Sequence, residues 1–102
     1  MKAILLSLAA VGLMATGSAH ASQALAQKNN CLSCHAIDKQ VVGPSYKAVA
    51  AKYKGDAAAP AKLAEKIKKG GSGVWGAVPM PPNPQVSDAD MKALVQWILA
   101  QK

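Results

Sequence analysis

The sequence of 102 residues contains no arginine and no phenylalanine, and aromatic residues amount to only 4% of it. The absence of arginine counts against a protein that reads nucleic acid, because arginine supplies the bidentate contacts to bases and phosphates. The 12 basic residues are all lysines, and against 5 acidic residues they give a formal net charge of +7. A positive surface of this kind suits solubility and electrostatic steering toward an acidic partner.

Long apolar runs are also scarce, and the one at the N-terminus covers residues 3–14. It is shorter than the roughly 20 residues of a membrane-spanning helix. Lys2 precedes it and an A-H-A tripeptide ending at Ala21 follows it, which is the arrangement of a cleavable secretory signal peptide. We therefore expect residues 1–21 to be removed on export to the periplasm. Residues 22–102 then form one domain without a membrane anchor.

The sequence has only two cysteines, and with the next residue they form the pattern C-x-x-C-H at Cys31, Cys34 and His35. This pattern is typical of c-type haem attachment. Each thiol can form a thioether to one vinyl group of the same porphyrin, and the histidine can ligate the iron. A thioredoxin-like dithiol is an alternative, but it is expected beside a βαβ pattern, which we do not find. A structural disulfide is a second alternative.

The rest of the chain predicts an all-α fold with long Gly/Pro loops, because no alternating apolar and polar run is long enough for a confident strand. Helices are expected at residues 22–30, with Leu25 as the main apolar contact, at 44–54, at 60–69, and after a capping Ser87. The hydrophobic core of so small a domain is only marginally stabilising, so such domains usually depend on an added cross-link or bound group. A covalently bound haem would serve as one.

Residues 70–86 form a loop with four glycines and four prolines, and so long a loop in a small domain is usually functional. Met80 lies among the prolines, which fix φ and remove N–H donors. A thioether is a suitable soft ligand for haem iron. Met1 and Met14 belong to the signal peptide and Met91 begins an apolar helix stripe, so Met80 is the candidate second ligand. The alternative is a gap-filling hydrophobe.

Three further residues are candidates for supporting roles around the haem. The indole N–H of Trp75 is suited to a haem propionate, although Trp75 could equally be a core residue. Asn83 could donate its amide to the Met80 sulfur, or be an ordinary polar loop residue. The ring N–H of a metal-bound histidine usually binds a carbonyl, and Pro44 lies near enough in sequence to supply one to His35.

With these residues in view, the chain resembles the small bacterial class I cytochromes c of the c-551/c-552 group. The segments that carry the resemblance are residues 31–38, 42–47, 73–76 and 78–83, and the similarity spans nearly all of residues 22–102. It implies several short helices around one haem, with the first and last helices crossing. It also implies thioethers at Cys31 and Cys34, iron ligation by His35 and Met80, and the supporting roles given above for Pro44, Trp75 and Asn83.

The chain departs from the group at two positions before the haem motif. Many members have glycine where this chain has Asn30, and some have phenylalanine where it has Ala26. We expect both departures to affect stability more than ligation.

The expected function is that of a monomeric periplasmic electron carrier, not an enzyme, because protein side chains would fill both axial positions of the iron. The resemblance implies a quinol-oxidising complex as donor and a terminal reductase, oxidase or peroxidase as acceptor. One alternative is a haem enzyme or gas sensor, in which Met80 would not bind. The other is a haem-free dithiol oxidoreductase.

Overall fold

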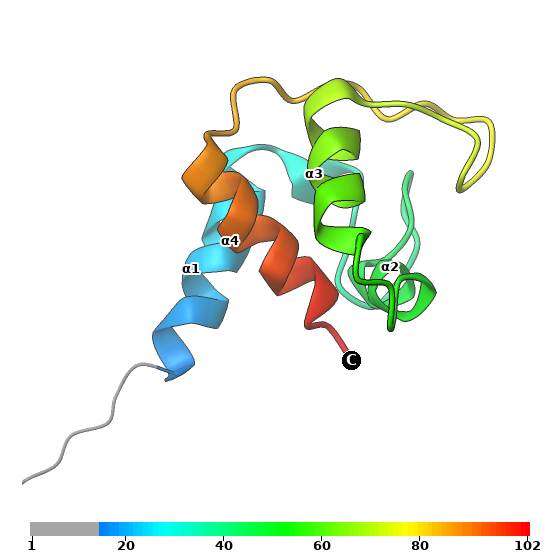
Figure 1. Ribbon diagram of the computed structural model, residues 1–102. Coiled ribbons are helices and arrows are strands. Elements are labelled where there is room, and N and C mark those ends of the chain that lie inside the picture. The colour runs from blue at the N-terminus through cyan, green and yellow to red at the C-terminus, as the bar shows by residue number, and fades with distance from the viewer. Residues whose placement is uncertain (1–14) are drawn as a thin grey trace, which may run out of the picture.

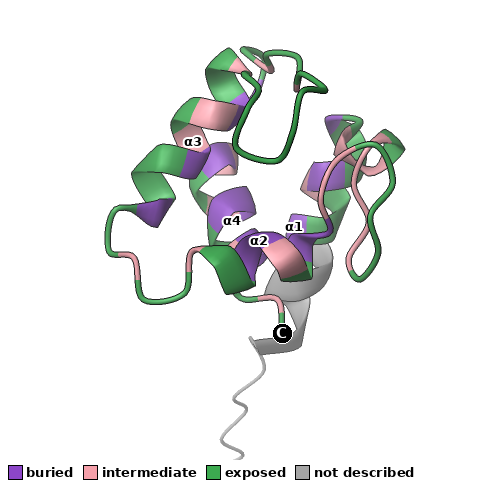
Figure 2. Ribbon diagram, turned by 90° about the vertical axis from the view of Figure 1, so that its right-hand side faces the viewer, coloured by how far each residue is buried: buried purple, intermediate pink, exposed green. Residues whose placement is uncertain are grey.

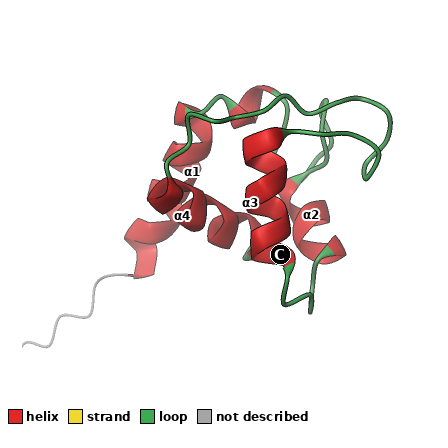
Figure 3. Ribbon diagram, turned by 45° about the horizontal axis from the view of Figure 1, so that its top comes forward, coloured by secondary structure: helices red, strands yellow, loops and turns green. Residues whose placement is uncertain are grey.

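The structure is a computed structural model and describes residues 15–102. It contains the helices α1 (Ala15–Lys28), α2 (Tyr46–Lys52), α3 (Ala59–Lys69) and α4 (Asp88–Leu99), and a short 3-10 helix, η1 (Cys31–Ser33). Within residues 15–102 there is no strand, only two isolated bridges, so the all-α prediction is confirmed (Figure 3). The apolar run of the predicted signal peptide lies outside the described residues.

Helix α4 is the centre of the fold and packs against α1, α2 and α3 (Figure 1). It begins at the predicted cap, because the side-chain oxygen of Ser87 accepts a hydrogen bond from the backbone N–H of Asp90 at 3.2 Å. Its acidic first turn suits the positive end of the helix dipole. The buried side of α4 supplies much of the core, through Met91, Leu94, Val95, Trp97 and Ile98.

Helix α1 crosses α4 (Figure 1), and the contact depends on a small side chain. Ala26 is fully buried, whereas Leu25, which we expected to make the main contact, is only half-buried. The Ser22 hydroxyl donates to the carbonyl of Ala93 at 3.4 Å. The alanine lets the two helices approach closely where a larger residue would hold them apart.

The first three helices differ from the sequence prediction at their boundaries, most clearly at the starts of α1 and α2. Helix α1 begins at Ala15, before the expected cleavage position, because its alanine-rich sequence favours helix there. Helix α2 begins at Tyr46 instead of residue 44, because Ser45 has an extended backbone and its side chain caps the N–H of Ala48 at 3.0 Å. Pro44 is therefore outside the helix, and its carbonyl is available to other groups. In the described part of the chain, no helix has the length and apolar character needed to cross a membrane.

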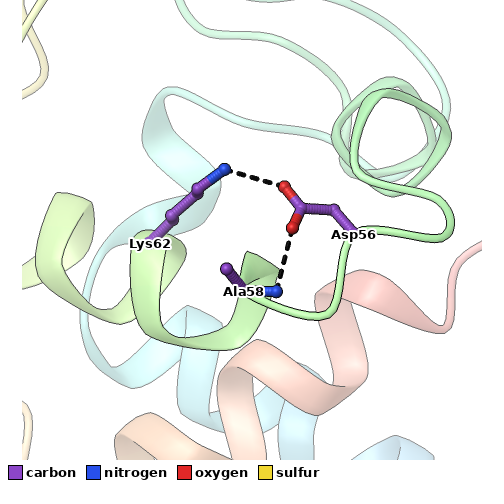
Figure 4. A network of polar contacts seen from close by, with 3 residues as sticks. All are labelled: Asp56, Ala58 and Lys62. Carbon is purple, nitrogen blue, oxygen red and sulfur yellow. Dashed lines mark hydrogen bonds and ion pairs between the residues drawn. The ribbon is translucent and has the colours of Figure 1, made fainter.

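The turn between α2 and α3 is held by the carboxylate of Asp56 (Figure 4). One oxygen accepts from the backbone N–H of Ala58 at 2.9 Å and the other from Nζ of Lys62 at 2.9 Å. These bonds tie the turn to the start of α3. The hydrogen bond from Lys62, helped by the one from Ala58, holds the pKa of the Asp56 carboxyl below its usual range.

We expect Asp56→Asn to lower the melting temperature slightly at neutral pH, because the pair is exposed. The pKa of this carboxyl is lower in the folded state, so its stabilisation is present above the unfolded value and is lost as the pH falls through the folded value. The difference between parent and variant should therefore shrink below about pH 4. Thermal melts across that range measure it, and Glu65→Gln, which breaks the exposed Glu65–Lys69 pair, is the control. A difference that does not depend on pH would contradict the assignment.

Candidate haem site

The C-x-x-C-H motif follows directly after α1, and its entry requires an unusual backbone. Asn30 has φ 60° and ψ 20°, the left-handed region in which asparagine is tolerated better than most residues. Glycine would adopt this conformation without the strain that a side chain causes. The backbone N–H groups of Cys34 and His35 then donate to the carbonyl of Cys31 at 3.1 and 2.9 Å. One tight turn thus carries both thiols and the imidazole.

The segment after His35 folds back beneath the imidazole. Nδ1 of His35 lies 2.7 Å from the carbonyl oxygen of Pro44, so a protonated Nδ1 donates to that carbonyl. This is the contact that we expected, and it leaves Nε2 as the nitrogen available to a metal. The N–H of Gly43 donates to the carbonyl of Cys34 at 2.8 Å and that of Tyr46 to the carbonyl of Ala36 at 2.9 Å, which closes the loop at both ends.

Two residues beside His35 were not singled out from the sequence as site residues. A Cβ atom on Gly43 would lie 2.5 Å from Cε1 of His35, so only glycine leaves room for the ring. The ring of Tyr46 stacks on the imidazole with centroids 5.3 Å apart and planes 26° apart. Tyr46 lies in the helix predicted at residues 44–54, and the nearness of both residues to Pro44 in the sequence was the available clue.

A cavity of about 250 Å3 lies between the motif and the loop that follows α3. Cys31, Cys34 and His35 line one side, Met80 lines another, and α3 and α4 contribute aliphatic side chains such as Ile67 and Leu94. Both thiols are free and only partly buried. An apolar cavity with two adjacent thiols, one imidazole and one thioether fits a flat macrocycle that is attached through two thioethers and has an axial ligand on each face.

The Met80 segment is fixed by backbone bonds. Met80 and Gly71 exchange two hydrogen bonds, at 2.8 and 3.0 Å, and the N–H of Asn83 donates to the carbonyl of Ile67 at 2.9 Å. Met80 is partly buried and packs against the core, whereas Met91 is a core residue of α4 that does not line the cavity. The structure therefore brings Met80, and not Met91, to the same cavity as His35.

Trp75 lines the cavity but is 45% exposed, so it is not a core residue. The ammonium group of Lys52 lies 5.5 Å from the centroid of its ring, within the range of a cation–π contact. Most of the loop around it is exposed (Figure 2). The described residues thus put Trp75 at the mouth of the cavity.

The structure differs from our expectation for Asn83. Its amide nitrogen donates to the carbonyl of Pro81 at 3.1 Å, and its amide oxygen accepts from Gln85 at 3.2 Å. It forms no bond to the Met80 sulfur, because the short Pro-rich turn offers a closer backbone acceptor. Asn83 here stabilises the loop that carries Met80.

The alternatives to haem attachment find little support in this geometry. Burial raises the pKa of the Cys31 thiol, whereas a reactive dithiol needs a lowered one. The two cysteines do not form a disulfide. Among the described residues, no three His, Cys, Asp or Glu side chains come together as they would in a conventional metal site.

Comparison with known proteins identifies the family of this chain. The sequence model of the family described as cytochrome c matches residues 19–102. The chain is 55% identical to cytochrome c-552 of Nitrosomonas europaea, over 92% of this chain and 91% of the relative. It is 52% identical to cytochrome c-551 of Pseudomonas aeruginosa, over 96% of this chain and 95% of the relative. The crystal structure of wild-type Nitrosomonas europaea cytochrome c552 is similar with a TM-score of 0.76 and 57% identity, covering 78% of this chain and 99% of that one. The chain therefore belongs to the cytochrome c family, whose members transfer electrons through a covalent haem c, here bound through Cys31 and Cys34.

Proposed function

We propose that this protein is a periplasmic carrier of single electrons whose haem iron is ligated by His35 and Met80. The observation that carries the proposal is the shared cavity, which has the C-x-x-C-H motif on one side and Met80 on another. The haem supplies the one-electron change between ferric and ferrous iron. Ligation by methionine and histidine raises the reduction potential relative to harder ligands.

The side chains around the cavity have separate tasks in this proposal. The Pro44 carbonyl accepts from Nδ1 of His35 and so directs Nε2 toward the iron. The backbone pair between Gly71 and Met80 holds the thioether in place. If His35 and Met80 both bound the iron, no coordination position would remain for a substrate or a gas, which favours a carrier over an enzyme or a gas sensor.

The mouth of the cavity is the proposed route for electrons. Its exposed apolar side chains include Val42, Val74, Trp75 and Val78. Trp75 is exposed enough to donate its indole N–H to a haem propionate. The protein acts as a monomer that receives electrons from a quinol-oxidising complex and delivers them to a terminal reductase, oxidase or peroxidase. The N-terminal signal peptide, cleaved after Ala21, directs it to the periplasm.

The test is to express the full chain with haem attachment in a bacterial host and to examine the periplasmic protein. We expect the absorption spectrum of a low-spin c-type haem that changes on reduction, and a mass equal to residues 22–102 plus one haem. A colourless protein with two free thiols would instead indicate a dithiol oxidoreductase. A high-spin spectrum would indicate an open axial position.

We expect the rate of electron exchange with an acidic redox protein to fall as salt is added. The formal net charge is +7 for the full chain and +6 once Lys2 is removed with the signal peptide, and Lys52 lies over the ring of Trp75 at the mouth of the cavity. Exposed charges are screened over about 8 Å at physiological ionic strength. Stopped-flow rates of the parent and of Lys52→Gln at several salt concentrations measure the effect, with Lys92→Gln on α4 as the control. Rates that stay flat with salt would leave the lysines a solubilising role only.

A further inference from the structure

Tyr46 has a position that the proposed function does not explain. It is 3% exposed, begins α2 and lines the cavity. Its backbone N–H donates to the carbonyl of Ala36 at 2.9 Å, and that of Lys47 donates to the carbonyl of Ile37 at 3.0 Å. The start of α2 is therefore fastened to the two residues that follow His35.

The side chain of Tyr46 joins His35 to the centre of the core. Its ring stacks on the imidazole, with centroids 5.3 Å apart. The same ring also meets the ring of Trp97 edge-on, with centroids 5.0 Å apart and planes 66° apart. Trp97 is buried in α4, the helix that contacts α1, α2 and α3. Tyr46 therefore contacts both the imidazole and the central helix of the fold.

The contacts of His35 with Pro44 and Gly43 do not by themselves fix the plane of the imidazole. The bond from Nδ1 to Pro44 fixes one edge of the imidazole, but the ring could still tilt about that edge. Gly43 limits the room near Cε1. A flat aromatic surface on the ring face opposes the tilt, and the stacked Tyr46 provides that surface.

The hydroxyl of Tyr46 is not the group that contacts His35. It is buried beside the Cys31 thiol and forms no hydrogen bond to the imidazole. The contact with His35 is made by the aromatic ring, so the contribution of this residue to the orientation of the imidazole resides in its ring.

We propose that Tyr46 is a positioning residue that fixes the plane of the His35 imidazole by stacking, with Trp97 packed against it. This inference rests on the proposed ligation of iron by His35. The orientation of an axial imidazole controls how unpaired spin spreads over a ferric haem, and the haem methyl NMR shifts report it. Tyr46 thereby affects an electronic property of the site without touching the iron.

The experiment compares haem-loaded Tyr46→Phe and Tyr46→Leu in the ferric state. We expect the phenylalanine variant to keep the haem methyl pattern of the parent, because it keeps the stacked ring. The leucine variant keeps apolar bulk but has no stacking face, so its methyl signals should change in spread and order. Val95→Ala, a buried change on α4 outside the cavity, controls for lost stability alone.

A second variant keeps the test decisive if Tyr46→Leu does not fold. Trp97→Leu leaves Tyr46 in place but removes the ring that packs against it. It should shift the haem methyl signals in the same direction as Tyr46→Leu does, but by a smaller amount. An unchanged pattern in both leucine variants would overturn the inference, and Pro44 and Gly43 would then suffice to orient His35. A parent protein whose spectrum lacks histidine ligation would overturn the proposed function instead.

Discussion

Replacing Met80 with alanine should leave the haem attached and open the iron to carbon monoxide. Attachment depends on Cys31 and Cys34, which lie on another wall of the cavity, so the variant should keep its haem through denaturation. In the parent, carbon monoxide binds only the fraction of molecules in which Met80 is displaced, which lowers its apparent affinity in proportion. We expect the ferrous variant to bind carbon monoxide at least about tenfold more tightly than the parent. Titrations followed by absorption measure both affinities.

Met91 provides a matched control for this experiment. Residues 15–102 contain one other methionine, Met91. It is buried in the core and does not line the cavity. Met91→Ala should lower stability by about 2–5 kcal/mol, as expected for a truncated core side chain, without increasing carbon monoxide binding. Equal carbon monoxide affinities in the parent and the Met80 variant would show that Met80 does not bind the iron, and would favour an open axial position.

The parts of the fold that the sequence predicted correctly depend on neighbours in the chain. The Ser87 cap and the apolar stripe of α4 follow from residue spacing, and both are present. The C-x-x-C-H motif is likewise local, since one turn holds both thiols and the imidazole. Met91 is a core residue, as its helical spacing predicted.

What the sequence did not predict depends on contacts between distant segments. The burial of Ala26 follows from how closely α1 approaches α4, and residue size alone favoured Leu25. The start of α2 depends on whether Ser45 caps the helix or belongs to its first turn. The extended backbone of Ser45 makes it the cap, and the sequence does not reveal that conformation. The stack of His35, Tyr46 and Trp97 joins three elements, so no spacing rule reveals it. For Asn83 the chemistry allowed several acceptors, and the fold of the loop selected Pro81.

Gly43→Ala should disturb the His35 side of the haem more than a methyl group added at any other glycine of the described residues, because only at Gly43 would the new atom meet His35. The added Cβ would lie 2.5 Å from Cε1 and 2.9 Å from Nδ1 of His35. The imidazole cannot yield easily, because Pro44 holds its Nδ1 and Tyr46 covers its face. We expect a loss of about 1–3 kcal/mol, typical of overpacking, and a melting temperature lower by several degrees. The haem methyl NMR shifts should change as well, because the ring must leave its present plane.

Gly55→Ala separates this steric effect from general loss of stability. Gly55 does not line the cavity; it has φ +81° and no atom within 4 Å of the added methyl group, so alanine there is strained by its backbone alone. The two variants should lose comparable stability, about 1–2 kcal/mol for the strained backbone. Only Gly43→Ala should also move the signals of His35 and of the haem methyl groups. If Gly55→Ala shifted those signals equally, the disturbance would follow from lowered stability, and the close fit of His35 against Gly43 would have no part in positioning the ligand.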